Sequence, residues 1–356
     1  MIADDLKALM RVPGLSGYEG RVASEIAGRM PVPCRSDRMG NLIATFPGTR
    51  PSVMLFTHMD QLGFVVRKIE ADGLIRVHRL GGVPERALPS QAVVLSTRDG
   101  RDIPGVLANK SHHATLPEEK HLVLSAPELF IDAGHGTKAD VEAAGISIGT
   151  PVTYAPNVID LAGGRIAGTA VDDRAGCAVL LDVARHLAER HGGPTVHLVF
   201  SAQEEFNLRG AAVAAQSLEP AIAIQVDLML ACDTPDMAHL GEMALGGGPG
   251  MSLYSFHGRG TLNGVLPHPA LVSLFEDTAG ALDMSLQKSA QTGVLTDLSY
   301  VQLVGEGVAA IDVGFPIRYS HSSLEVCQIS DLEDLSHLLV EAIGRIKSGI
   351  HLERWS

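Results

Sequence analysis

Residues 195–236, TVHLVFSAQEEFNLRGAAVAAQSLEPAIAIQVDLMLACDTPD, decide the fold. TVHLVF and AIAIQVDLMLA are short apolar runs that are typical of buried strands. LRGAAVAAQSL between them carries apolar residues at the three- and four-residue spacing of a helix. Because strands that alternate with helices usually belong to a parallel sheet covered by helices, this stretch predicts an α/β fold with a mostly parallel sheet.

The same alternation extends outward through most of the chain. Further helices and strands are predicted over residues 3–12, 17–30, 41–46, 52–57 and 174–190. Near the other end, Ser330 and Glu333 have the spacing of a capping box. They predict the start of a final amphipathic helix that runs to about residue 347.

A different pattern fills residues 62–163. Short strand-like pieces follow one another there, interrupted by Gly and Pro, with one helical pattern at 137–145. Such a pattern is typical of a small β-rich domain. We therefore predict an α/β domain formed by residues 1–61 and 164–356, in which helices flank a mixed, mostly parallel sheet, with the β-rich domain inserted between them.

Composition excludes several classes of protein. The 356 residues include 28 Lys and Arg against 41 Asp and Glu, a net charge of −13 with no basic block, so we expect no nucleic-acid partner. A hydrophobic fraction of 46% supports a large core, and the length suggests two domains. The sequence contains no apolar run of membrane-spanning length and no Cys-x-x-Cys pair. We therefore predict a cytoplasmic protein without a membrane partner.

Polar side chains follow several predicted strands, where α/β proteins place their ligands. These side chains are His58, Asp60, Asp172, Glu204, Glu205, Asp227 and His321. Taken singly, each has a simpler interpretation as a strand-end His, a helix-capping acid or a solvated acid at the head of a helix. Asp227 is the exception in its apolar strand, because a buried carboxylate must be paired, protonated or bound to a metal.

Together these side chains supply two imidazoles and three or four carboxylates. That inventory suits a pair of divalent ions, and the absence of clustered Cys or Met disfavours softer metals. The adjacent Glu204 and Glu205 suit a division of roles, in which one carboxylate binds a metal and the other accepts a proton from water. The residue types leave Zn²⁺, Co²⁺ and Mn²⁺ open.

Five motifs occur in the order of a known family. They are THMDQLGF, VDDRAG, QEEFNLRGA, VDLMLACDTPD and RYSHSSLE. In these motifs the chain resembles the deblocking and glutamyl aminopeptidases, di-metal exopeptidases also called tetrahedral aminopeptidases, over nearly its whole length. The resemblance implies hydrolysis of N-terminal residues from peptides with a free N-terminus. It also implies two divalent metal ions per subunit, Zn or Co, with Mn as a third option.

The resemblance implies a role for each candidate metal ligand. Asp172 would bridge the two metals. His58 and Asp227 would complete one metal site, while Glu205 and His321 would complete the other.

It also implies roles for two further acids. Glu204 matches the general base, which takes a proton from a water shared by the two metals and later delivers it to the leaving amine. Asp60 matches the acid that orients the imidazole of His58.

Other features of the family bear on assembly and specificity. Its inserted domain commonly supports dimers that assemble into a hollow dodecamer, so the resemblance implies a homo-oligomer. Gln61 and Asp236 stand where relatives often have Glu and Gly, and these differences bear on electrostatics and specificity, so the sequence assigns no particular N-terminal side chain as the preferred one. His112 and His113 resemble a family loop near the substrate channel, and they suit a solvated surface loop equally well.

Two other functions stay open. Parts of the family carry an endoglucanase label, but a glycoside hydrolase needs two carboxylates about 5–10 Å apart, and sugar-binding aromatic residues. The chain is only 4% aromatic and has one Trp. A non-catalytic peptide-binding scaffold would keep the fold without needing Glu204.

Overall fold

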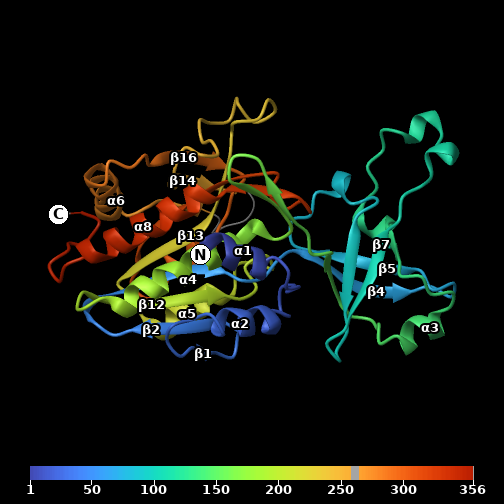
Figure 1. Cartoon of the computed structure of the whole chain (residues 1–356), viewed down its shortest axis with the longest axis horizontal. Helices are drawn as coiled ribbons and strands as arrows, with labels where there is room; N and C mark the ends of the chain where they lie inside the picture. Colours follow the sequence, from blue (N-terminus) through green and yellow to red (C-terminus); the bar gives the residue numbers. More distant parts are fainter. Residues whose placement is uncertain (258–263, 356) are drawn as a thin grey trace.

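The computed structural model describes residues 1–257 and 264–355, which form two lobes (Figure 1). One lobe is built on a 12-stranded sheet and the other on a closed barrel. The chain leaves the sheet after β3 (Thr49–His58) and re-enters it after β9 (Pro151–Tyr154), the last strand of the barrel. The predicted α/β fold with an inserted β-rich domain is confirmed.

The centre of the sheet is parallel. Its four strands are, in spatial order, β12 (Pro194–Ser201), β3, β13 (Ile222–Leu230) and β17 (Ala309–Arg318). In β3, Val53 and Leu55 pack into the apolar cluster on one face, and Met54 and Phe56 pack into the cluster on the other. Because both faces are covered, these strands read as continuous apolar runs in the sequence.

Helices cover both faces of this centre (Figure 1). The first face carries α1 (Ile2–Leu9), α4 (Val171–Glu189), α6 (Pro269–Ala281) and α8 (Ile329–Arg345), and the second carries α5 (Gly210–Leu218) and α7 (Leu298–Val301). The short α2 (Gly20–Ala27) packs beside α1.

The predicted capping box of the last helix is wrong. The helix begins at Ile329, so Ser330 lies inside its first turn, and Asp331 accepts hydrogen bonds from the backbone of Gly246 and Gly248.

The margins of the sheet are mostly antiparallel. They consist of β1 (Arg35–Ser36), β2 (Leu42–Phe46), β10 (Val158–Leu161), β11 (Arg165–Gly168), β14 (Gly250–Phe256), β15 (Gly264–Val265), β16 (Gln287–Thr292) and β18 (Glu325–Gln328).

Strand β10 lies inside the range 62–163 that we assigned to the inserted domain, yet it pairs with β11 in the large sheet. Ile159 and Leu161 of this edge strand are exposed, so no buried pattern marks its place. The limits of the two domains stay a prediction.

The barrel closes in the spatial order β4-β5-β8-β7-β6-β9. Its other strands are β4 (Gly63–Ile69), β5 (Ile75–Leu80), β6 (Ala92–Ser96), β7 (Asp102–Leu107) and β8 (Phe130–Asp132). Its helical turns are η1 (Glu85–Ala87), η2 (His112–Ala114), η3 (Pro117–Glu119), η4 (Ala126–Glu128) and α3 (Lys138–Ala143). Phe64, Val77, Leu95 and Ile131 belong to its own apolar core, separate from that of the sheet. Among the described helices, none is long and apolar enough to cross a membrane.

Candidate functional site

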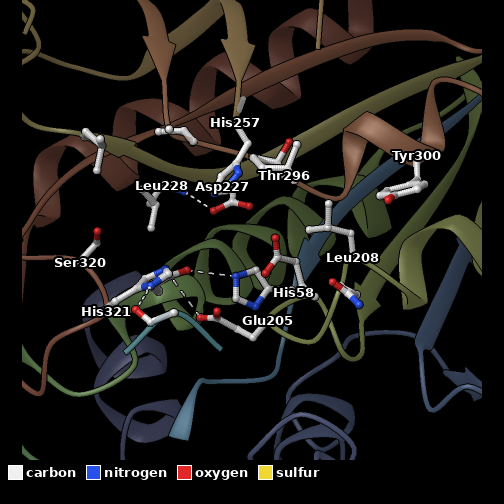
Figure 2. A pocket seen from close by; sticks show the side chains of 18 of the residues that line it. His58, Glu205, Leu208, Asp227, Leu228, His257, Thr296, Tyr300, Ser320 and His321 are labelled. Carbon is white, nitrogen blue, oxygen red and sulfur yellow. Dashed lines mark hydrogen bonds and ion pairs between the residues drawn. The ribbon is translucent and has the colours of Figure 1, made fainter. Parts of the chain in front are cut away.

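The candidate residues converge at the carboxyl ends of the central strands. His58 ends β3, and Asp227 lies near the end of β13. Glu204 and Glu205 follow β12, and His321 follows β17. All five line one cavity of about 580 Å³, and Figure 2 shows the side chains of His58, Glu205, Asp227 and His321 pointing into it. A cavity of this size at the carboxyl edge of an α/β sheet has the position and volume of a small-molecule or peptide site.

Two groups of possible metal ligands share Asp172, at the start of α4. His58, Asp172 and Asp227 each offer a ligand atom, all within 4.8 Å of one another, and Asp172, Glu205 and His321 form a second such group. Oδ1 of Asp172 lies 3.0 Å from Nε2 of His58, and its Oδ2 lies 3.3 Å from Nε2 of His321. One carboxylate therefore presents a separate oxygen to each group. The structure brings together all five predicted ligands.

The charges of this cluster are unbalanced without cations. Burial, together with the neighbouring charge of Asp172, raises the pKa of Glu205 and of Asp227 to about 7. Burial alone would lower the pKa of His58 and of His321, but the surrounding carboxylates outweigh it and raise both pKa values well above the ordinary range. Protons thus supply the positive charge that two divalent ions would otherwise provide. Imidazole and carboxylate donors in this arrangement fit a pair of such ions.

Asp60 lies behind the ligands and is fully buried. Its Oδ1 accepts a hydrogen bond from the backbone N–H of Glu204 (3.0 Å), and its Oδ2 accepts bonds from the N–H of Glu205 (3.1 Å) and the hydroxyl of Ser16 (2.5 Å). Nδ1 of His58 lies 3.1 Å from the backbone oxygen of Asp60 and 3.5 Å from its Oδ1. Asp60 therefore ties the end of β3 to the loop that carries both glutamates, and it contacts the His58 ring as well.

Glu204 lines the cavity with 8% of its surface exposed. Burial and the charges of nearby acids, Asp227 foremost, raise its pKa well above the ordinary range although His58 opposes the shift. Its loop has a second support that sequence reasoning missed, because Oε1 of Glu19 accepts hydrogen bonds from the N–H of Gln203 (3.0 Å) and of Gly17 (2.7 Å). Nothing in the sequence distinguishes Glu19 from an ordinary surface acid before a helix.

Several other acids play different parts. Asp173 accepts hydrogen bonds from the hydroxyl of Thr57 and from the N–H of Gly176 (2.9 Å), so its carboxylate belongs to the packing beneath the site. Asp233, which follows β13, forms an ion pair with Arg318 at 2.7 Å. The sequence analysis gave neither acid a ligand role.

Some histidines differ from expectation. His257 follows β14 and lines the cavity, and it was not among the candidate residues selected from the sequence. His112 and His113 form the exposed turn η2 on the barrel and are absent from the lining of the cavity. In this chain the turn has the character of the solvated surface loop that we kept as one of its two interpretations.

Comparison with known proteins decides the family. A family model described as M42 glutamyl aminopeptidase matches residues 40–338. The chain belongs to the M42 glutamyl aminopeptidase family. The Escherichia coli protein SgcX is 35% identical to it over 350 residues, covering 96% of this chain and 93% of that protein. The lysyl aminopeptidase of Pyrococcus furiosus is 30% identical over 353 residues and covers 96% of each chain. The chain is therefore an aminopeptidase of this metallopeptidase family.

Solved structures of the family agree. An aminopeptidase of Desulfurococcus kamchatkensis superimposes with a TM-score of 0.90 at 32% identity, over 98% of this chain and 95% of that one. The TET1 peptidase of Pyrococcus horikoshii, which can assemble into a tetrahedron or a large octahedral shell, gives 0.88 at 25% identity over 97% and 100%. A Thermotoga maritima structure named endoglucanase gives 0.73 at 30% identity over 95% and 96%. The predicted family, fold and enzyme class are confirmed.

Proposed function

We propose that the chain removes N-terminal residues from peptides with a free N-terminus, with the aid of two divalent cations. The proposed ligands are His58, Asp172, Glu205, Asp227 and His321. The observation that carries the proposal is the sharing of Asp172, whose two oxygens face the two ligand groups separately. Zn²⁺ and Co²⁺ are the proposed ions, with Mn²⁺ as an alternative, because imidazole and carboxylate donors accept all three.

Bound cations would supply Lewis-acid polarisation of the scissile carbonyl and easier deprotonation of water. Glu204 is the proposed general base, and its position in the cavity suits it to accept the proton of the attacking water and to pass it to the leaving amine. Its raised pKa favours holding that proton between the two steps. Asp60 and Glu19 accept hydrogen bonds from the backbone of Gln203, Glu204 and Glu205. These bonds hold the proposed general base in one position in the cavity.

The cavity does not favour a glycoside hydrolase. Among its lining residues in the described part of the chain, Tyr300 is the only Phe, Tyr or Trp. Sugar rings are held mainly by stacking on such side chains, and the acid-rich wall suits the positive amino terminus of a peptide better.

Replacing Glu204 by Gln tests the proposed mechanism. The amide keeps the volume of the side chain but cannot accept the proton, so turnover of aminoacyl substrates should fall by about 10⁴-fold. Metal content, measured by elemental analysis after reloading, should stay close to that of the unmodified protein. Glu333→Gln, an exposed change on α8, is the matched control. A Glu204→Gln variant with substantial activity would exclude Glu204 as the base.

The chain is also proposed to form a homo-oligomer, with dimers that assemble into a dodecamer. Support comes from the solved structure of PhTET1-12s, which is a dodecamer, and from the exposed Leu116, Leu122, Val123 and Leu124 between β7 and β8. Apolar side chains gathered on one protruding segment are typical of protein interfaces. Light scattering should give a mass near 12 chains, and a monomer at micromolar concentration would contradict the proposal.

A further inference from the structure

A narrow polar recess adjoins the large cavity beside Asp227. Its volume is about 20 Å³, enough for roughly one water-sized group. Both spaces are lined by Asp227, Leu228, Leu230, Val294 and Thr296, so the recess lies directly beside the cavity. In Figure 2, Leu228 and Thr296 lie on either side of Asp227.

The recess has a polar end. Its polar lining beyond Asp227 consists of Ser252, Ser255, Ser289, Gln291, Thr296 and Asp312. Asp312 is 4% exposed, and its Oδ1 accepts a hydrogen bond of 3.1 Å from the hydroxyl of Thr296. Within the described residues, Oδ2 of Asp312 and the hydroxyl of Ser255 have no hydrogen-bond partner. Buried polar atoms are nearly always paired, so two unpaired ones at the same small space point to an absent partner.

The missing partner should be positively charged. The lining of the recess includes no Lys, Arg or His among the described residues. The charged groups that act most strongly on Asp312 are Asp227 and Asp297, and both are acids. Burial and the charge of Asp227 raise the pKa of Asp312 to about 8, so a cation placed at its free oxygen would stabilise the ionised carboxylate.

The register of the strands sets the distance between this end and the proposed metal site. Asp227 lies opposite Gly314, and Asp312 lies opposite Gln225, two residues earlier along the parallel strands. Two residues of a strand cover about 7 Å, and neighbouring strands are about 5 Å apart. Leu228, Leu230 and Val294 give the recess an apolar wall. A flexible chain of methylene groups that ends in a cation matches this apolar wall and acidic end.

We propose that the recess binds the side-chain ammonium of an N-terminal lysyl residue, and that Asp312 determines this specificity. The inference rests on the proposed aminopeptidase function. A lysyl side chain places a compact ammonium at the end of a four-carbon stem, whereas the planar guanidinium of arginine is larger than a recess of about 20 Å³ accommodates. Lysyl substrates are therefore preferred over arginyl, norleucyl and glutamyl ones.

The test compares kcat/KM of the metal-loaded enzyme for the p-nitroanilides of lysine, arginine, norleucine and glutamate. Lysine and norleucine have stems of the same length and differ by the charged group. The lysyl substrate should be favoured over the norleucyl one by about 10- to 100-fold. Asp312→Asn should reduce this ratio to near one. Asp277→Asn, an exposed change on α6, is the matched control and should leave the ratio as it is.

Inhibition of the unmodified enzyme by lysinamide and by norleucinamide gives a second measurement, which does not depend on the folding of a variant. Lysinamide should inhibit about tenfold more strongly or better. Equal cleavage of lysyl and norleucyl substrates, or an equal loss on all substrates in Asp312→Asn, would overturn the inference. Failure to cleave any of the four substrates would instead count against the proposed function itself.

Discussion

Asp60 and Asp227 are two buried aspartates at the ends of neighbouring strands, yet their surroundings are opposite in kind. Burial alone would raise the pKa of Asp60, but the contact with His58 outweighs it and lowers the pKa, helped by hydrogen bonds from the Ser16 hydroxyl and two backbone N–H groups. Asp227 accepts bonds from Gln225 and from its neighbour Leu228, but burial and the charge of Asp172 raise its pKa to about 7.

The difference separates scaffold from binding site. An acid whose oxygens are already paired holds the protein in shape, because its charge is stabilised by fixed dipoles. An acid that is buried among other acids is unstable in its ionised form, and a bound cation stabilises that form. Asp60 belongs to the first kind, and Glu205 and Asp227 belong to the second. Glu19 also pairs with backbone N–H groups, but burial and the charge of Asp60 raise its pKa.

The largest effect is expected for Asp172→Asn, which removes the charge shared by both ligand groups. Both metal ions should be lost on gel filtration, and activity should fall by about 10⁴-fold. Elemental analysis with aminoacyl p-nitroanilide turnover provides the measurement. Retention of two metals per chain would show that Asp172 does not bridge the proposed sites.

Breaking the scaffold should act on catalysis with metal content preserved. Glu19→Ala leaves the N–H groups of Gly17 and Gln203 without their acceptor, which should cost about 1–3 kcal/mol of unfolding free energy. We expect kcat to fall by about tenfold while KM changes little, because the loop of Glu204 is no longer held. Glu19→Gln keeps an acceptor oxygen and should restore most of kcat. If Gln and Ala behave alike, the hydrogen bonds are not the cause.

The barrel contributes a smaller effect through Gly82, whose carbonyl accepts a hydrogen bond from Nδ1 of His321 at 3.0 Å. A methyl group on Gly82 would lie 2.9 Å from that same nitrogen, so Gly82→Ala must displace the ring. We expect metal affinity and kcat/KM to fall by about tenfold. Gly136→Ala, in open space on the same lobe, should change neither quantity. Equal affinities in the two variants would show that the ring tolerates the shift.

The smallest effect is a dependence of stability on pH. In the metal-free protein the pKa values of Glu205 and Asp227 are about 7, above their ordinary 4.5 and 3.8. The folded state therefore holds protons that the unfolded chain has already lost, and the free energy of unfolding should decrease as the pH rises toward 7. His58 and His321 act in the same direction, because their folded pKa values are raised above 6.5 and their stabilisation is lost as the pH rises through those values.

Calorimetry can measure this dependence with chelator present and with metal restored. The Tm of the metal-free protein should fall by several degrees between about pH 5.5 and about pH 8, and the stabilisation by metal should grow over that interval. A Tm that rises with pH in chelator would contradict the charge distribution described for Asp227 and its neighbours.

Much of the site was predictable because its residues follow strands. The ends of parallel strands meet at one edge, so apolar runs that stop at His58, Glu204 and His321 were enough to predict a shared site. Glu19 could not be predicted, since it contacts Gln203 from 184 residues away. The pairing of β10 with the large sheet could not be predicted either, because an exposed edge strand carries little apolar signal.

By itself the sequence determined the alternation of helices and strands, the presence of a β-rich insertion, and the five side chains that the structure brings to one cavity. These follow from local periodicity and from ordered motifs, which are properties of neighbouring residues. Only the tertiary structure decided which acids are paired and which are not. Asp60, Asp227 and Asp312 are the same residue type near strands, but their charges differ in cost. Asp60 accepts hydrogen bonds from residues distant in sequence, Asp227 accepts them from its own strand while it lies among other acids, and Oδ2 of Asp312 has no partner among the described residues.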